Sequence, residues 1–85
     1  MTITEVPPQL RWACRRGMLE LDVLLGNFLE EAFLSLTEQD QAIFVKLLSE
    51  NDQDLFMWLT GHKIPENTKF AGMVGKIRHH AQNRH

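Results

Sequence analysis

The chain has 85 residues and a formal net charge of −2, with 44% hydrophobic and 24% charged residues. This length allows one domain, and the composition of an ordinary globular protein excludes the disordered and fibrous classes. The single cysteine excludes an internal disulfide, and no apolar run reaches the roughly 18 residues of a membrane span. The first residues, MTITEVPPQL, lack the basic start and apolar stretch of a secretory signal, so we expect a cytoplasmic protein.

Hydrophobic spacing predicts helices along almost the whole chain. A short helix over residues 9–16 follows a Pro-Pro pair, which favours an extended approach. Gly17 then breaks the pattern, because glycine tolerates the left-handed backbone that ends a helix. Apolar residues from 21 to 33 recur at helical spacing and predict one long amphipathic helix.

The second half of the chain carries three further helix signals. Thr37 is a predicted N-cap for a third helix that extends to about residue 48. Asn51 or Asp52 can cap a short fourth helix, which Gly61 would end. A last apolar stripe, over residues 70–81, follows a proline-containing loop.

These elements predict an all-α fold, a compact bundle of about five short helices. We expect a single helical domain over residues 1–85, with a flexible N-terminus at 1–8 and a polar tail at 79–85. Charge is segregated along the chain, because residues 20–54 carry nine acids against the single base Lys46. Solvated helix surfaces explain such a pattern as well as a charged partner does.

The stretch CRRGMLELD, at residues 14–22, concentrates charge around the predicted glycine joint. Helix dipoles account for part of it, since arginine in a last turn and acid in a first turn are each stabilising. Trp12 is not explained in this way, because it lies on the side of the first helix that does not face the core. Physical chemistry leaves two interpretations of Trp12 open, a buried structural residue or an interaction surface shared with arginine.

Two longer blocks, WACRRGMLELD at 12–22 and FVKLLSENDQDLFMWLTG at 44–61, together resemble the bacterial succinate dehydrogenase flavinylation factors, the SdhE or YgfY family. The resemblance covers most of the chain, from Trp12 to about Ile77. The RGxxE motif of that family falls on Arg16, Gly17 and Glu20. The chain differs from the family pattern at Gln53, where a proline is usual.

The resemblance implies a helical, chaperone-like factor that binds the flavoprotein subunit of succinate dehydrogenase, and in some bacteria that of fumarate reductase. Such a factor promotes covalent attachment of FAD to a histidine of that subunit and needs no catalytic group, cofactor or metal of its own. We therefore expect a partner-binding patch in which Arg16 and Glu20 are exposed beside Trp12 and Arg15. The residues expected to bind the partner are Trp12, Arg15, Arg16, Gly17, Glu20 and Asp22.

The sequence contains no recognisable phosphate loop, catalytic constellation or metal-ligand spacing. Cys14, on the apolar side of the first helix, is expected to be a buried structural thiol, and Trp58 a structural aromatic residue. Two alternative functions remain open. The basic end from Lys76 to Arg84 would suit a nucleic-acid binder, although the overall acidity of the chain opposes it. Members of the same family are also described as antitoxins, which would make the partner a membrane-associated toxin.

Overall fold

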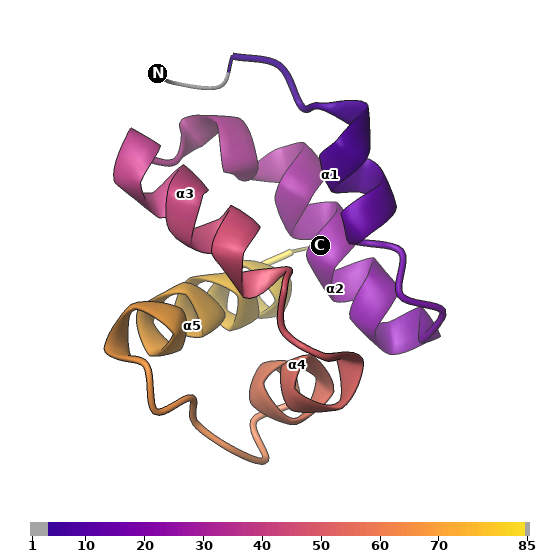
Figure 1. Cartoon of the computed structure of the whole chain (residues 1–85), viewed down its shortest axis with the longest axis vertical. Helices are drawn as coiled ribbons and strands as arrows, with labels where there is room; N and C mark the ends of the chain where they lie inside the picture. Colours follow the sequence, from indigo (N-terminus) through magenta and orange to yellow (C-terminus); the bar gives the residue numbers. More distant parts are fainter. Residues whose placement is uncertain (1–3, 85) are drawn as a thin grey trace.

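The computed structural model describes residues 4–84, and every regular element in this range is helical (Figure 1). The elements are α1 (Pro8–Ala13), α2 (Leu19–Glu31), the 3₁₀ turn η1 (Phe33–Ser35), α3 (Glu38–Leu47), α4 (Asp52–Leu59) and α5 (Thr68–Gln82). The predicted all-α class with five helices is confirmed. The radius of gyration of 11.8 Å equals the value of about 12 Å expected for one compact domain of this length.

Local capping residues set three of the predicted helix boundaries. The Thr37 hydroxyl accepts the Asp40 backbone N–H at 3.1 Å, which begins α3. Asn51 accepts the Asp54 N–H at 2.8 Å, so it is Asn51 rather than the following aspartate that caps α4. Gly61 adopts a φ of +84° after α4, as its position beyond the helix end predicts.

The two ends of the chain differ from the expectation. Pro8 already belongs to α1, and Val6 packs against the core, whereas Thr4 and Glu5 are exposed and lie outside any regular element. Residues 1–3 of the expected flexible segment lie outside the described residues. At the other end, α5 includes the apolar stripe expected at 70–81 and ends at Gln82, so the polar segment expected at 79–85 begins within this helix.

Contacts with the end of α2 hold the last turn of α5. The His80 ring meets Phe28 edge-on, with ring centroids 5.5 Å apart, and its Nε2 lies 3.0 Å from a Glu31 carboxylate oxygen. Arg84 Nε reaches the same carboxylate at 2.9 Å. These partners lie about 50 residues away in the sequence, so the local sequence of the segment does not indicate these contacts.

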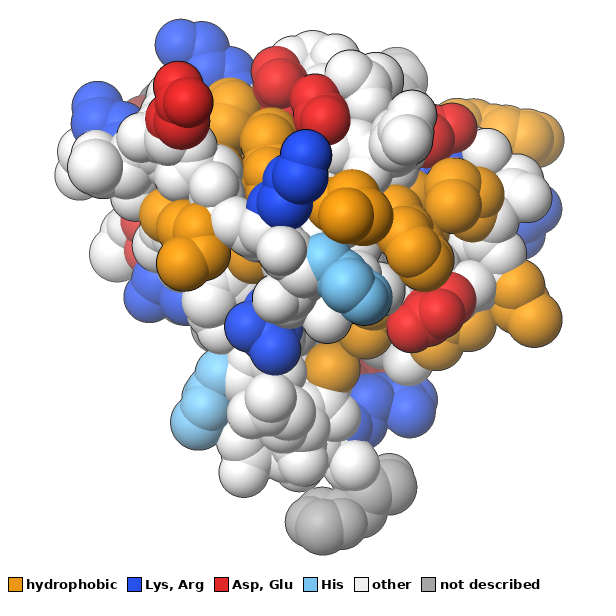
Figure 2. Space-filling view, turned by 90° about the horizontal axis from the view of Figure 1, so that it is seen from below, with side chains coloured by type: hydrophobic (Ala, Val, Ile, Leu, Met, Phe, Trp, Pro, Cys, Tyr) orange, Lys and Arg blue, Asp and Glu red, His pale blue; other side chains and the backbone are white. Residues whose placement is uncertain are grey.

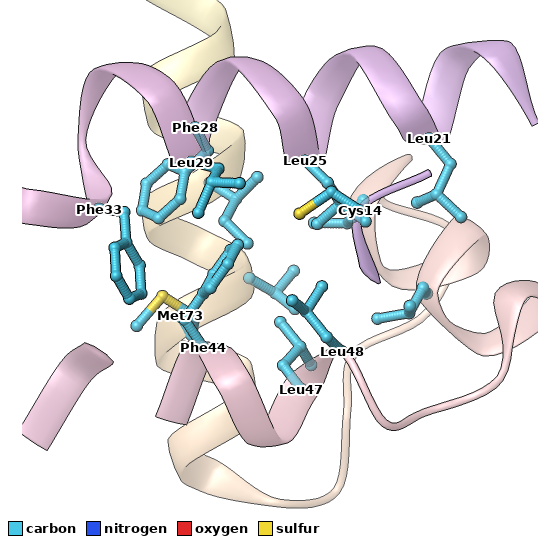
Figure 3. Packing of buried hydrophobic residues seen from close by; sticks show 14 of the residues in the cluster. Cys14, Leu21, Leu25, Phe28, Leu29, Phe33, Phe44, Leu47, Leu48 and Met73 are labelled. Atoms are coloured by element: carbon cyan, nitrogen blue, oxygen red, sulfur yellow. The ribbon is translucent and has the colours of Figure 1, made fainter. Parts of the chain in front are cut away.

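A single apolar core holds the helices together. α5 packs against α2, α3 and α4, while α1 lies along α2. Figure 3 shows core side chains from α2, α3 and α5 meeting with Cys14, which follows α1. The buried apolar residues are Leu10, Cys14, Leu21, Leu25, Phe28, Leu29, Phe33, Phe44, Leu47, Leu48, Leu55, Leu59, Met73, Val74 and Ile77. The expected structural role of Cys14 is confirmed, and half-buried Trp58 packs against this cluster as predicted.

Candidate partner-binding site at the α1–α2 joint

Arg16 is the centre of the joint between α1 and α2, and its side chain is largely enclosed, with 16% of it exposed. The guanidinium reaches across to the turn between α3 and α4. Nε donates to Oδ1 of Asp52 at 2.6 Å, which joins residues from two distant parts of the chain. The expectation that Arg16 lies on an exposed patch is therefore wrong.

Three backbone carbonyls complete the contacts of the Arg16 guanidinium. Nη1 donates to the carbonyl oxygens of Ala13 at 2.9 Å and Leu48 at 2.7 Å, and Nη2 donates to that of Glu50 at 2.7 Å. Arginine suits this position because its planar fork can address several acceptors at once, which a lysine ammonium cannot do in the same geometry. The residue thus satisfies carbonyls left free at the ends of α1 and α3 and fixes the joint to the α3–α4 turn.

Asp22 holds the same joint from the α2 side. Its carboxylate accepts the backbone N–H of Arg16 at 2.6 Å and that of Gly17 at 3.2 Å. Gly17 itself adopts a φ of +84°, which confirms the predicted left-handed joint. A Cβ at Gly17 would meet nothing within 4 Å, so this position requires glycine for its backbone conformation and not for lack of space.

The exposed side of the joint carries Trp12 and Arg15. Trp12 is 71% exposed, which decides between the two interpretations of this residue in favour of a surface position. The Arg15 guanidinium carbon lies 5.7 Å from the centroid of the Trp12 ring, within cation–π range. Because α1 ends at Ala13, neither arginine of the joint lies in its last turn as expected, and that turn contains Arg11 instead.

The first turn of α2 extends this surface with apolar and acidic groups. Leu19 is 81% exposed and Val23, one turn further along, is 49% exposed. Glu20 is exposed between them and has no hydrogen-bond or ion-pair partner within residues 4–84. We call Trp12, Arg15, Leu19, Glu20 and Val23 the joint surface.

A shallow hollow of about 450 Å³ between α1 and α2 connects the two halves of the joint surface, since Arg15 and Val23 both line it. At its edge Arg11 Nε donates to Glu30 at 2.6 Å, and this hydrogen bond lowers the pKa of the Glu30 carboxyl. Cys14 lies at its base, where burial raises the pKa of the thiol to about 12. The thiol is therefore protonated at neutral pH and is a poor nucleophile.

The six residues expected from the sequence thus fall into two groups. Trp12, Arg15 and Glu20 lie on the joint surface, whereas Arg16, Gly17 and Asp22 form the framework behind it. Exposed Leu19 and Val23 were not expected, and neither was the partnership of Arg16 with Asp52. Asp52 lies within the second of the two resembling blocks, but no spacing rule in one sequence joins it to residue 16.

Most of the chain, including the joint, is similar to proteins of a known family. The family described as "Flavinator of succinate dehydrogenase" matches residues 8–81, a range that includes α1, the joint and the α3–α4 turn. The chain belongs to this family. Two relatives, both named FAD assembly factor SdhE, support the assignment. The protein from Vibrio vulnificus strain CMCP6 is 54% identical over 94% of this chain and 93% of its own length, and that from Coxiella burnetii is 50% identical over 82% and 85%.

A solved structure of the family has the same fold. The solution structure of a UPF0350 protein superposes with a TM-score of 0.78 and 51% identity, covering 96% of this chain and 87% of that one. Family membership and fold are therefore supported over nearly the whole chain and not by the two motif blocks alone.

Proposed function

We propose that this chain is an FAD assembly factor, which binds the flavoprotein subunit of succinate dehydrogenase through the joint surface and promotes covalent attachment of FAD to that subunit. The observation that carries the proposal is that the joint has two sets of residues, one that holds the backbone and one that is exposed. Arg16 and Asp22 hold the backbone rigidly, while Trp12 and Glu20 are left free to contact another protein. Family membership and the names of the relatives supply the identity of the partner.

The composition of the joint surface suits protein binding better than catalysis. Exposed tryptophan next to arginine is typical of interface hot spots, and Leu19 and Val23 add apolar area around them. A factor of this kind accelerates a reaction by holding its client in the geometry that the reaction needs. The chain then supplies surface and rigidity, and the flavin and its acceptor residue belong to the client.

As part of this proposal, the chain has no catalytic group and no FAD of its own. Among residues 4–84 no three His, Cys, Asp or Glu side chains are placed to hold a metal ion, and the one thiol is protonated. Within the same range no helix has the length and apolar character to cross a bilayer. Binding of the fumarate reductase flavoprotein and a cytoplasmic location are further parts of the proposal.

The nucleic-acid alternative becomes weaker because much of the basic charge near the C-terminus is paired. Lys76 Nζ lies 3.8 Å from an Asp40 oxygen, and Arg84 is bound to Glu31. A surface that binds phosphates needs cations that are free to exchange counterions.

Reconstitution with purified components tests the proposed function. The apo-flavoprotein subunit is incubated with FAD in the presence and absence of the chain, and covalent flavin is read as fluorescence of the denatured subunit in a gel. We expect covalent flavin to rise with the amount of chain added, and the purified chain alone to show no flavin absorbance. Equal fluorescence with and without the chain would contradict the assembly role, and a chain that purifies with stoichiometric flavin would contradict the absence of an FAD site.

A further inference from the structure

A second surface, remote from the joint surface, lies between α3 and the start of α5. An open hollow of about 880 Å³ lies there, lined by Gln39, Ala42, Ile43, Val45, Lys46, Glu66, Asn67, Thr68, Lys69 and Phe70. In Figure 1 this region and the α1–α2 joint lie on opposite sides of the molecule. The hollow shares no residue with the joint surface, so the proposed flavoprotein contact does not account for it.

The floor of this hollow is apolar and partly open to solvent. Ile43 and Phe70 are half-buried, and Val45 is 40% exposed. A neighbouring hollow of about 520 Å³ shares Phe70 and continues past Ile64, which is 83% exposed. Figure 2, seen from the side of α4 and the loop after it, shows that hydrophobic side chains reach the surface at several points between charged groups. Phe70 lines both hollows, so the exposed side chains of Val45 and Ile64 border one apolar-floored surface, which suits the binding of a partner.

Three lysines without ion-pair partners surround the two hollows. Lys46 and Lys69 line the first and Lys63 lines the second. Within the described part of the chain, none of the three has a carboxylate at ion-pair distance. Four other bases, Arg11, Arg16, Lys76 and Arg84, are each paired. Arg15 and Arg78 also have no ion pair within the described residues, but neither lines these hollows. Acids line them too, since Glu66 borders both and Glu50 borders the second. In the first hollow Lys46 and Lys69 outnumber the single Glu66, so its charge complements an occupant that carries carboxylates.

We propose that this groove, which we call the lysine groove, binds an amphipathic helix of a partner protein, with an apolar stripe that faces Val45 and Phe70 and with acidic residues that meet Lys46 and Lys69. A helix is the appropriate occupant because the walls are themselves helices, and a third helix can lay its apolar side between them. Pairing with an extended peptide requires a sheet edge, and residues 4–84 contain no strand.

Two other occupants fit the groove less well. A second copy of this chain would have to offer an acidic amphipathic helix, but the main apolar stripe of α2 is buried in its own core. The apolar and acidic side chains that α2 does expose, Leu19, Glu20 and Val23, belong to the joint surface proposed for the flavoprotein. An anionic membrane would attract the three lysines, yet it would repel a chain whose overall charge is negative. The helix of another protein satisfies both the apolar floor and the charge.

A designed peptide serves as the probe, so the test does not depend on any flavoprotein. It has about 18 residues, or five helical turns, with leucine at i, i+3, i+4 and i+7 positions and glutamate on its flanks. A control peptide carries lysine in place of glutamate. Each is titrated into the ¹⁵N-labelled full-length chain, and amide shifts are followed by NMR.

We expect the acidic peptide to shift the amides of residues 42–46 and 63–70 and to leave those around Trp12 unchanged, while the lysine peptide binds at least about tenfold more weakly. Lys69→Glu should weaken the acidic peptide by about tenfold and improve the lysine peptide. Arg78→Glu is the matched control, an exposed base of the same helix that lines neither hollow. For the apolar floor, Val45→Ser should weaken binding, whereas Leu34→Ser, at a similarly exposed position on η1, should not.

Several results would overturn the proposal. The proposal fails if no amide shifts at millimolar peptide, or if the shifts centre on the joint surface. It also fails if the Lys69→Glu variant and the unmodified chain bind the acidic peptide with equal affinity. Groove amides that shift with the concentration of the chain alone would identify a second copy as the occupant. Groove amides that respond to phosphatidylglycerol vesicles and not to the peptide would identify a membrane surface instead.

Discussion

Arg16 and Asp52 are separated by 36 positions in the sequence, and a 2.6 Å hydrogen bond between Nε and Oδ1 connects them. Together with the carbonyls of Leu48 and Glu50, this contact fastens the α1–α2 joint to the α3–α4 turn. The Arg16 of the RGxxE motif is thus a positioning residue in this structure. Its effect on a partner is exerted through the shape of the joint surface.

Replacement of Arg16 by alanine should therefore destabilise the protein. The change leaves Asp52 without its cation and leaves three carbonyl oxygens without donors, and we expect a loss of about 2 kcal/mol or more in the free energy of unfolding. For a domain of this size that corresponds to a decrease in Tm of roughly 10 °C. Thermal melting followed by circular dichroism measures it, and Arg15→Ala, at the exposed neighbouring position, is the control. A Tm unchanged within about 2 °C would contradict the positioning role.

Trp12 should give the opposite pattern to Arg16. Because Trp12 is 71% exposed, Trp12→Ala should change the free energy of unfolding by no more than about 0.5 kcal/mol. As an anchor of the joint surface it should nevertheless contribute about 2 kcal/mol of binding, so that the flavoprotein binds about thirtyfold more weakly. Calorimetric titration with the apo-flavoprotein subunit tests this, with Leu34→Ala as an exposed apolar control outside the joint. Equal affinity of Trp12→Ala and the unmodified chain would remove Trp12 from the proposed interface.

Gly17 allows backbone conformation and partner contact to be separated. With φ at +84°, any side chain costs about 1 kcal/mol, but the open space around the position imposes no clash. Gly17→Ala and Gly17→Arg should therefore be destabilised by similar amounts. Only the arginine should block the partner, because its long side chain extends over the joint. If both variants bound the flavoprotein equally well, the partner would not approach this part of the backbone.

The predictions from sequence were accurate where short-range rules decide the structure. Thr37, Asn51, Gly17 and Gly61 were recognised because capping and left-handed turns depend on residues only a few positions away. The helical period placed Trp12 on the side of the first helix away from the core but left its burial open, and its exposure became known from the structure. The enclosure of Arg16 could not be predicted, because exposure depends on which distant segment folds against a residue.

The same limit applies at the C-terminal end of the chain. The apolar stripe predicted a helix to about residue 81, but no local rule predicted that His80 and Arg84 would contact Phe28 and Glu31 of α2. Such contacts are a property of the tertiary fold and leave no local pattern in the sequence. Leu19 and Val23 show the same limit for apolar residues. The helical period places them at the edge of the apolar stripe of α2, and whether they are buried depends on where α1 packs.

Cys14 predicts a specific dependence of stability on pH. Burial raises the pKa of its thiol to about 12, above the ordinary value of 9.0, so the folded state keeps a proton that the unfolded state loses. Stability from this group is fully present below about pH 9 and decreases as the pH rises from about 9 to about 12. The chain has no tyrosine to titrate in the same range, although lysines do. Urea midpoints at pH 7 and pH 10 should therefore differ more for the unmodified chain than for Cys14→Ala, and equal differences would contradict the buried, protonated thiol.

The two acids in the first turn of α2 provide the sharpest test of the division between surface and framework. Asp22 accepts the N–H groups of Arg16 and Gly17, so Asp22→Asn should cost about 1 kcal/mol or more of stability, since the amide oxygen is a weaker acceptor than the carboxylate. Glu20 has no partner in the described structure, so Glu20→Gln should leave the Tm unchanged. It should instead weaken flavoprotein binding and covalent flavin formation together, because the free carboxylate is available for a donor on the partner. The assignment is reversed if Glu20→Gln melts early and binds normally, since Glu20 would then belong to the framework and the joint surface would lose its only acid.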